Sequence, residues 1–383
     1  MRSLPTLFLP FILACALLSP ATPTATVVPP TATPAPPTPT VTPSLPLISA
    51  PSLTAFHMLD ERNGWGLDDN HVLRTEDGGE TWYDVTMPEA PELGYAAASF
   101  FLDAKTAWVL AGGGGGPTAN GTLYRTLDGG LTWSSFTVPF GFGALYFLDA
   151  NNGWAIADLG VAAGSQAVSI YRTTDGGATW TQTYTNDPNL AGAGESLPLG
   201  GLKSRLVARD MQTAWVGGVI YASGTIYLYQ THDGGYTWSQ SPLAPPAEMA
   251  ESQFQTDGPI LVSAQEAFLP VIAFEQMSQM LIYRSHDGGE TWELTPTRIP
   301  NGGSADFFSP AEGVLWNGEQ FYLTTDGAQT WSAVTPNIFF GDTFIGMDFV
   351  NSKTGWVLSR DTSEQTILYK TTDGGATWEP LVP

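Results

Sequence analysis

Short runs of alternating apolar and polar residues follow one another along the chain, and turn residues separate them. Alternation over about four to eight residues predicts half-buried β-strands, because successive side chains of a strand point to opposite faces. The stretch from Tyr95 to Pro139 divides into four such runs, at 95–103, 106–112, 122–128 and 132–139. Patterns typical of helices are nearly absent, so the sequence predicts an all-β protein.

An eight-residue motif marks the turn between the third and fourth strands of each unit. It first occurs as "TEDGGETW" at residues 75–82 and recurs six more times, with Ala328 replacing the second glycine in one copy. Glycine supplies the backbone conformations of a tight turn, and the Asp carboxylate can accept hydrogen bonds from N–H groups of the same turn. A reaction needs its catalytic residue once, so seven copies favour a structural part. The repeated positions are Asp77, Asp128, Asp175, Asp233, Asp287, Asp326 and Asp373, with Trp82, Trp133, Trp180, Trp238, Trp292, Trp331 and Trp378.

A second repeated pattern precedes each copy of the motif. A short polar turn leads to Gly or Ala and then, in most copies, to an aromatic residue, as in "LDERNGWG" from Leu59. The two patterns contain 12 of the 13 Trp residues, which indicates that the indole rings are repeated packing units. Four-stranded units that recur seven times predict a seven-bladed β-propeller over residues 46–383. We expect its ring to close either through "LPLIS" at residues 45–49 or through packing of the first blade against the seventh.

The first 15 residues are typical of a bacterial lipoprotein signal. Arg2 precedes a short apolar run, and "ILAC" at residues 12–15 resembles the lipobox, in which the cysteine thiol takes a lipid. The alternative is an ordinary signal sequence with Cys15 in its core and cleavage a little later. Residues 16–45 are rich in Pro and Thr and predict an extended linker that cannot bury a core. We therefore expect an extracytoplasmic protein that is either secreted or anchored to a membrane through a lipid on Cys15.

The charge of the chain limits its partners. A formal net charge of −23 makes nucleic acid an unexpected partner, and it leaves a lipid anchor as the expected contact with a membrane. The four His residues are scattered, and no motif for a metal or a cofactor occurs. We expect neither a cofactor nor a metal, and we expect a monomer.

The repeated motif, [ST]-x-D-G-G-x-T-W, is similar to the Asp box, or bacterial neuraminidase repeat. Asp boxes occur in sialidases, sortilin-type receptors, xyloglucan hydrolases and the photosystem II stability/assembly factor family, all within the sialidase-like superfamily. The assembly factors also have the upstream turn with its "GW" pair, so the chain resembles them most, over residues 50–383. This resemblance implies a non-catalytic propeller that binds partner protein during assembly of a complex. It also implies a basic patch, whereas this chain has only 14 Lys and Arg residues.

Features of a glycosidase are weak in this sequence. Arg298, Ile299 and Pro300 resemble the Arg-Ile-Pro of sialidases, but they lie between the fifth and sixth Asp boxes, whereas the sialidase motif precedes the first. A chance tripeptide is the better interpretation. Neighbouring acidic residues in predicted loops, such as Asp68 and Asp69, are more simply explained as solvated side chains than as a catalytic pair. We therefore predict no catalytic residues.

Function is expected on the face opposite the Asp boxes. The regular turns share one face of the disc, and the irregular insertions lie on the other, which predicts a binding surface for protein or glycan. Exposed aromatic and Arg side chains are common interface anchors. The predicted contacts are Phe140, Phe142, Arg205, Arg298, Phe339, Phe340 and Arg360. The alternative is that these Phe side chains cap the central channel.

Three classes of function remain at this point. The first is a membrane-tethered binding or assembly scaffold without catalytic activity. The second is a carbohydrate-active hydrolase of sialidase or xyloglucanase type, or a glycan-binding protein. The third is a structural protein of a cell-surface array, which would associate with itself.

Overall fold

The computed structural model describes residues 45–88, 93, 98–112 and 119–381, which belong to a single compact unit, Leu45–Pro383. The predicted signal sequence, Cys15 and almost all of the predicted linker lie outside the described residues. The described residues are almost entirely β-structure, as predicted. Two short 3₁₀ helices, η1 (Ala247–Met249) and η2 (Gly341–Thr343), are the only helices among them.

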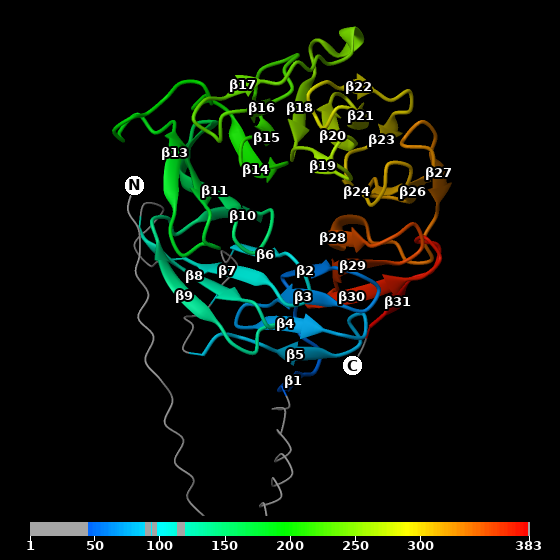
Figure 1. Cartoon of the computed structure of the whole chain (residues 1–383). Coiled ribbons are helices and arrows are strands. Elements are labelled where there is room, and N and C mark those ends of the chain that lie inside the picture. The colour runs from blue at the N-terminus through cyan, green and yellow to red at the C-terminus, as the bar shows by residue number, and fades with distance from the viewer. Residues whose placement is uncertain (1–44, 89–92, 94–97, 113–118, 382–383) are drawn as a thin grey trace, which may run out of the picture. The chain divides into compact units, whose positions relative to one another are not determined.

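The strands pair into seven units of four antiparallel strands within the described residues, in agreement with the predicted seven blades. Figure 1 shows these blades around a central axis. The first three blades are β2 (Ala55–Met58), β3 (Gly64–Leu67), β4 (Val72–Thr75), β5 (Trp82–Asp84); β6 (Ala98–Phe101), β7 (Ala107–Ala111), β8 (Gly121–Thr126), β9 (Ser134–Val138); and β10 (Gly143–Phe147), β11 (Gly153–Ala162), β12 (Ser165–Thr173), β13 (Thr181–Thr185). The fourth and fifth are β14 (Leu202–Ala208), β15 (Ala214–Val219), β16 (Leu228–Thr231), β17 (Ser239–Gln240); and β19 (Ile260–Leu261), β20 (Ala267–Phe274), β21 (Gln279–Ser285), β22 (Glu293–Leu294). The last two are β24 (Ser304–Phe307), β25 (Gly313–Trp316), β26 (Phe321–Thr324), β27 (Ser332–Val334); and β28 (Phe344–Phe349), β29 (Gly355–Arg360), β30 (Thr366–Thr371), β31 (Glu379–Pro380).

The ring closes by packing of the first blade against the seventh. Inner strand β2 contacts inner strand β28, and the indole N–H of Trp356 donates to the carbonyl of Gly78 at 2.8 Å. The alternative closure through residues 45–49 is wrong. Strand β1 (Leu47–Ile48) pairs with β5 as a fifth, outer strand of the first blade, and the seventh blade takes all four of its strands from the C-terminal region.

The Asp boxes tie each turn together and fix it to the neighbouring turn. In the first box, the Asp77 carboxylate accepts from the N–H and hydroxyl of Thr81 at 2.9 and 2.6 Å and from the hydroxyl of Thr75 at 2.9 Å. The N–H of Gly78 donates to the carbonyl of Arg62, which lies in the upstream polar turn, and the equivalent bond recurs in all seven blades. Both kinds of turn therefore lie on one face of the disc, which is called the box face below.

Basic residues join each of the first five blades to the next one. Arg74, which precedes the first box, donates to the carbonyl of Gly129 in the second box at 2.9 Å, and Arg172 donates in the same way to Gly234. The fourth blade has Gln230 at this position, and Arg209 from its inner strand region reaches the carbonyl of Gly288 instead, at 3.0 Å. Since several of the few basic side chains hold blades together, they are not available to form the basic patch that the family resemblance implies.

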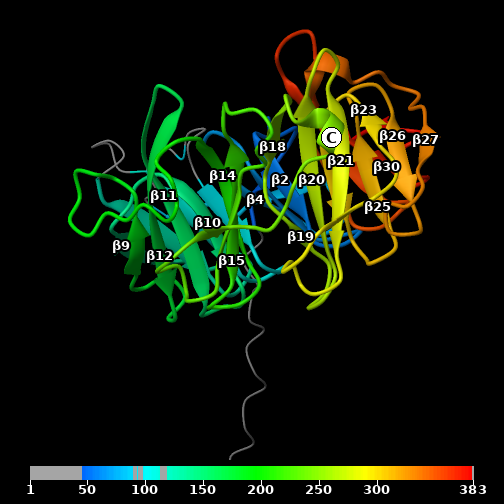
Figure 2. The ribbon, with the colours of Figure 1, turned by 90° about the horizontal axis from the view of Figure 1, so that it is seen from above.

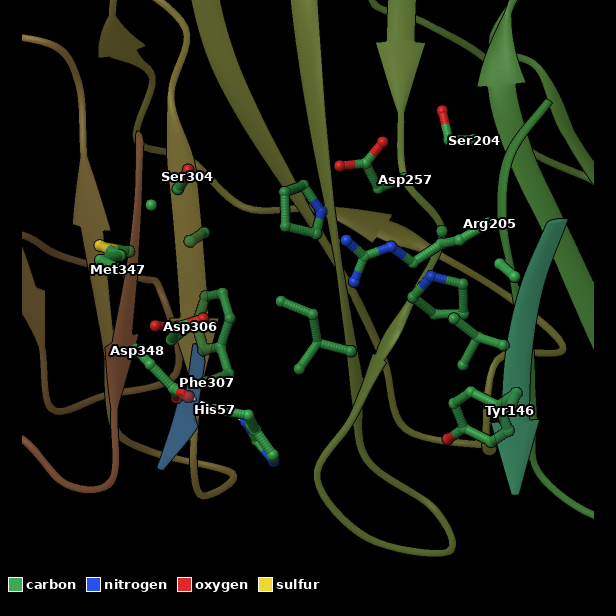
Figure 3. A pocket seen from close by; sticks show the side chains of 18 of the residues that line it. His57, Tyr146, Ser204, Arg205, Asp257, Ser304, Asp306, Phe307, Met347 and Asp348 are labelled. Carbon is green, nitrogen blue, oxygen red and sulfur yellow. Dashed lines mark hydrogen bonds and ion pairs between the residues drawn. The ribbon is translucent and has the colours of Figure 1, made fainter. Parts of the chain in front are cut away.

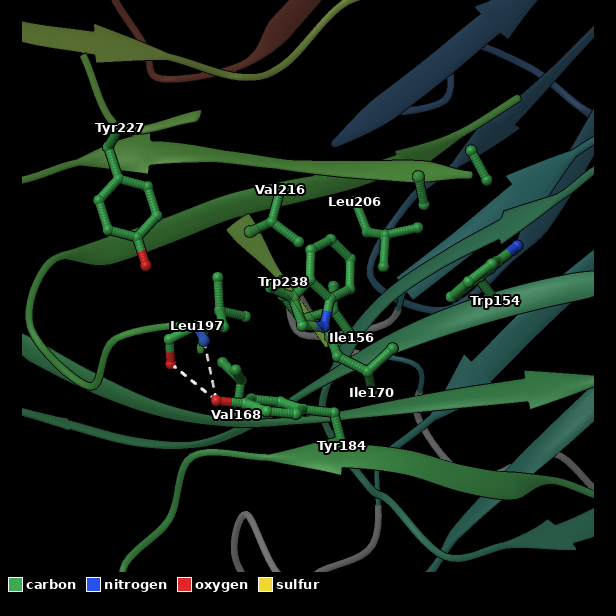
Figure 4. Packing of buried hydrophobic residues seen from close by; sticks show 12 residues of the cluster. Trp154, Ile156, Val168, Ile170, Tyr184, Leu197, Leu206, Val216, Tyr227 and Trp238 are labelled. Carbon is green, nitrogen blue, oxygen red and sulfur yellow. Dashed lines mark hydrogen bonds between the residues drawn. The ribbon is translucent and has the colours of Figure 1, made fainter. Parts of the chain in front are cut away.

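The apolar core lies between the faces of adjacent blades. Figure 4 shows the cluster between the third and fourth blades, where Trp154 and Ile156 pack near Leu206 and Val216. Leu197 from the long segment between β13 and β14 is also fully buried there, and its N–H donates to the hydroxyl of Tyr184 at 2.8 Å. This long insertion is therefore fixed to the core.

The face opposite the boxes, called the variable face below, is more regular than predicted. The insertion at residues 158–168 forms a continuation of the β11–β12 hairpin, with a bulge between Asp158 and Gly160. Figure 2 shows this hairpin and the loop between β29 and β30 rising on one side of the disc. The insertion at residues 241–259 contains η1 and β18 (Gln253–Thr256), which pairs with both β15 and β20 and so joins the fourth and fifth blades. Strand β23 (Ile299–Pro300) pairs with β21 at the same side of the fifth blade.

Candidate binding site in the central channel

The inner strands surround a central cavity of about 1150 Å³. Because side chains of a strand alternate between its two faces, every second residue of an inner strand faces this channel. The residue three positions before the first polar residue of each upstream turn, such as His57 before Asp60, occurs once per blade. All seven of these residues line the cavity. In chain order they are His57, Phe100, Tyr146, Val207, Ile260, Asp306 and Asp348.

This ring of side chains is divided into two arcs. The sixth, seventh and first blades contribute Asp306, Asp348 and His57, which form a charged arc. The second to fifth blades contribute aromatic and aliphatic residues, which form an apolar arc. Figure 3 shows the charged arc on one wall of the channel, with Tyr146 and Arg205 on the opposite wall.

Hydrogen bonds hold the charged arc across the gaps between blades. The Oδ2 atom of Asp348 accepts from the N–H of Met58 at 2.7 Å and lies 2.8 Å from Nδ1 of His57. The Oδ2 atom of Asp306 accepts from the N–H of Phe349 at 3.1 Å. Neither Oδ1 atom has a hydrogen-bond partner among the described residues. Each carboxylate therefore keeps one oxygen for the channel.

Two members of the charged arc, Asp306 and His57, have shifted pKa values. Burial, followed by the negative charge of Asp348, raises the pKa of Asp306, and the Phe349 N–H, His57 and Arg205 offset only part of this effect. Burial acts to lower the pKa of His57, but the hydrogen bond to Asp348 and its charge outweigh burial, so the pKa of His57 is raised. Protons are therefore held more tightly in this arc than by isolated side chains.

Arg205 is the cation that faces the arc from the fourth blade. It is exposed and lines the channel two residues before Val207, and no ion pair engages it among the described residues. A shift of register between Lys203 and Leu206 sets its direction. The nearby Lys203 is turned away, because its Nζ donates to four backbone carbonyls, among them those of Gln166 at 3.0 Å and Leu199 at 2.9 Å.

The structure separates the predicted contact residues. Phe140 and Phe340 are each only 1% exposed. Phe140 packs between the second and third blades, and Phe340 packs between the sixth and seventh. The prediction of surface contacts is therefore wrong for these two residues. Phe142 is half-buried, whereas Phe339 is 75% exposed. None of the four Phe side chains lines the channel, which leaves the alternative of a channel cap without support.

The predicted Arg residues also have different surroundings. Arg298 pairs with Glu248 near η1, and Arg360 lies exposed at the end of β29. Of the predicted contacts only Arg205 reaches the channel. His57, Asp306 and Asp348 were missed because His57 looked isolated and the two acids are not neighbours in sequence. Alignment of the seven blades at their polar turns would have found all three, since they occupy one column.

The described residues contain no group of three or more His, Cys, Asp or Glu side chains placed to hold a metal ion. No helix in the described part of the chain is long and apolar enough to cross a membrane.

Comparisons with known proteins agree with the fold. A model of the BNR/Asp-box repeat matches residues 283–294. The photosystem II assembly lipoprotein Ycf48 of Synechococcus sp. (strain CC9902) is 24% identical over 284 residues, which are 71% of this chain and 72% of that protein. A solved structure of YCF48 bound to D1 peptide is 18% identical with a TM-score of 0.52, and the match covers 85% of this chain and 95% of that chain.

A carbohydrate-active enzyme shares the same fold. The GH74 xyloglucanase of Xanthomonas campestris is 13% identical with a TM-score of 0.57, and the match covers 89% of this chain and 55% of the enzyme. At such identities the solved structures establish the fold alone. The chain is therefore an Asp-box β-propeller that is similar in sequence to a photosystem II assembly lipoprotein.

Proposed function

We propose that this protein is a non-catalytic, extracytoplasmic scaffold that binds a segment of a partner protein during assembly of a complex. The observation that carries the proposal is the relationship in sequence to a photosystem II assembly lipoprotein, which extends over most of the propeller. A solved propeller of similar fold is described as bound to a peptide, which favours protein as the ligand class. The partner segment binds at the mouth of the channel on the variable face.

The arrangement of acidic residues is in keeping with binding. The seven Asp-box carboxylates accept hydrogen bonds within their own turns. We therefore assign them a structural part and no part in binding or catalysis. Asp306 and Asp348 each accept a backbone N–H from the next blade, which makes them part of the ring as well as part of its wall. Arg205 and Phe339 are the exposed predicted contacts best placed to test the variable face.

Capture of the partner tests this function. The full chain is used as bait in extracts of its own host, alongside R205A and F339A variants and a K105A control, whose exposed side chain lies on the box face. We expect one reproducible partner that is lost from the R205A or F339A bait and kept by K105A. Equal capture by all baits, or loss with K105A alone, would contradict binding at the variable face.

Membrane attachment forms a separate part of the proposal. We propose that Cys15 carries a lipid and that residues 16–45 hold the propeller away from the membrane, as the relative's description as a lipoprotein suggests. Metabolic labelling with an alkyne fatty acid should mark the full chain and not a C15S variant. Labelling of both proteins, or of neither, would remove the lipid anchor.

A carbohydrate-active hydrolase is the second candidate. A xyloglucanase shares the fold, and two carboxylates face one cavity in this chain, as a glycosidase requires. Incubation with xyloglucan, pectic and sialylated oligosaccharides, analysed by mass spectrometry, separates the two functions. Turnover that disappears in D306N and D348N would establish the hydrolase and overturn the scaffold.

A further inference from the structure

We propose that the central channel receives a lysine or arginine side chain of the partner segment, with its cationic head group between Asp306 and Asp348. This inference rests on the proposed function and names the chemistry by which the site would recognise its partner. It follows from three features of the channel: the free carboxylate oxygens, the apolar arc and the depth of the acids.

The free carboxylate oxygens define the charge of the head group. Asp306 and Asp348 lie on adjacent blades, each with Oδ2 engaged by a backbone N–H and Oδ1 without a partner among the described residues. A donor placed between them can bind both Oδ1 atoms, and a cation offsets the burial and the charge repulsion that raise the pKa of Asp306. An anionic ligand would instead meet three carboxylates, those of Asp257, Asp306 and Asp348, for the single Arg205, so the charge balance favours a cation.

The apolar arc fits the aliphatic part of such a side chain. Lysine and arginine bury their methylene stems along apolar surfaces while their charged heads remain in polar surroundings. Tyr146 lines the wall opposite the charged arc (Figure 3), and Phe100, Val207 and Ile260 line other parts of the channel. A small inorganic cation would leave this apolar wall unused.

The depth of the acids requires a long side chain. Inner strands run from the variable face to the box face, so Asp306 lies two residues deeper than Ser304, and Val207 lies two residues deeper than Arg205. Two residues of a strand span about 7 Å, close to the reach of an extended lysine side chain. The partner backbone would then lie near the level of Arg205, whose guanidinium can donate to a carbonyl or carboxylate of the same segment.

Calorimetric titration of the full chain with short blocked peptides tests this assignment. The peptides are acetylated and amidated, and their central residue is lysine, arginine, norleucine or acetyl-lysine. Norleucine keeps the stem without the charge, and acetyl-lysine keeps the length without the charge. We expect the two cationic peptides to bind at least about 10-fold more tightly than the two neutral ones, as for charge-assisted hydrogen bonds.

Variants place the binding in the channel. D306N and D348N keep an oxygen acceptor for the backbone N–H. Each variant should lower the affinity for the lysine peptide by about 10-fold. E293Q, which removes a carboxylate from the exposed outer strand β22, is the matched control and should leave the affinity unchanged. Melting curves of all variants check folding. If D348N does not fold, D306N alone still decides the outcome.

The pH dependence gives a second readout. The groups that face Asp306 are Asp348, His57 and Arg205, and Asp257 and Tyr146 also line the cavity. A bound cation replaces the proton that Asp306 holds, so the lysine peptide should bind more tightly as the pH rises. D306N should make this trend weaker and leave the part that comes from deprotonation of His57.

The outcomes separate this inference from the proposed function. Equal binding of the lysine and norleucine peptides, or binding that D306N leaves unchanged, would overturn the cation site while capture of the partner still stands. Loss of partner capture with intact lysine binding would overturn the scaffold function and keep the cation site. Tighter binding of a neutral xyloglucan oligosaccharide than of any peptide would overturn both.

Discussion

Asp77 and Asp306 are both aspartates held by hydrogen bonds, yet their surroundings shift their pKa values in opposite directions. Burial acts to raise the pKa of Asp77, but hydrogen bonds from Thr81 and Thr75 outweigh it, so the pKa lies below its ordinary value. Asp306 is buried beside a second carboxylate and has a single backbone donor, so its pKa is raised. A repeated residue with many local donors is therefore structural, and an acid with few donors in a cavity is available to a ligand.

The raised pKa of Asp306 predicts that the folded protein loses stability as the pH rises. Its folded-state pKa lies above its unfolded value, so its contribution is complete below the ordinary value of 3.8 and is lost as the pH rises through the folded value. D306N imitates the protonated form and should raise the melting temperature near pH 8 by roughly 2 °C or more, with little change near pH 4. Scanning calorimetry of both proteins at both pH values measures this. An equal fall in the melting temperature of D306N at both pH values would contradict the raised pKa of Asp306.

Lys203 gives a second prediction at the level of single residues. Burial lowers the pKa of Lys203 to about 8, and four backbone carbonyls surround its Nζ. K203M would remove the hydrogen bonds that Nζ donates to these carbonyls and should lower the free energy of unfolding by about 2–4 kcal/mol. Urea unfolding measures the loss, with exposed Lys105 changed to Met as control. A cost no larger than that of K105M would show that the contacts of Lys203 add nothing.

Individual residues differ in how well the sequence predicts them. The Asp-box positions could be predicted because the same eight residues recur with the same local hydrogen bonds. Phe140 and Phe340 were misplaced because burial at the end of a blade depends on neighbours from other strands, such as Trp180 beside Phe140 and Trp378 beside Phe340. The channel ring needs both the repeat and the alternation of the inner strands, so it appears only when the blades are aligned.

At the level of elements, the contact between the third and fourth blades recurs between the fourth and fifth blades although the sequence changes. Arg172 stacks on Trp154 with its guanidinium 5.1 Å from the ring centre, and in the fourth blade Arg209 takes the same place over Trp215 at 5.9 Å. The cation thus comes from a different part of the blade but contacts the Trp residue at the equivalent position. Sequence could predict the four-stranded units, but not this substitution or the pairing of β1, because both depend on contacts between distant segments.

The substitution in the fourth blade predicts that R209A is as costly as removal of a regular contact. R209A and R284A should each lower the free energy of unfolding by about 1–3 kcal/mol, since each loses a hydrogen bond to the next box and a cation–π contact. R62A, in an exposed turn, is the control and should cost less than about 1 kcal/mol. Chemical denaturation of the three variants measures the differences. If R209A left the free energy of unfolding unchanged, the fourth blade would have no such contact.

At the level of the whole molecule, the seam between the first and seventh blades closes the ring through noncovalent contacts. Trp356 is fully buried and donates across the seam to Gly78, whereas the Nε1 of buried Trp215 has no partner among the described residues. Seven-fold repetition predicted the ring from sequence. The way it closes could not be predicted, because the strand at Leu47–Ile48 is too short to show which blade it joins.

These two Trp residues form a matched pair for testing the seam. W356F and W215F remove similar volume from buried positions, but only W356F removes a hydrogen bond. We expect W356F to lower the free energy of unfolding by about 1 kcal/mol more than W215F does. Denaturant unfolding followed by circular dichroism measures both. A greater loss in W215F would contradict the part assigned to the Trp356 hydrogen bond.

The proposed function and the proposed cation site put partner protein at the variable face and in the channel, while the Asp boxes only support the fold. Hydrogen exchange of the full chain, measured by mass spectrometry with and without the captured partner, distinguishes this arrangement from binding at the box face. We expect slower exchange in β24, in β28 and in the segment around Phe339, with unchanged exchange in the seven Asp-box turns. Protection of the Asp-box turns, with no change in the inner strands, would contradict it.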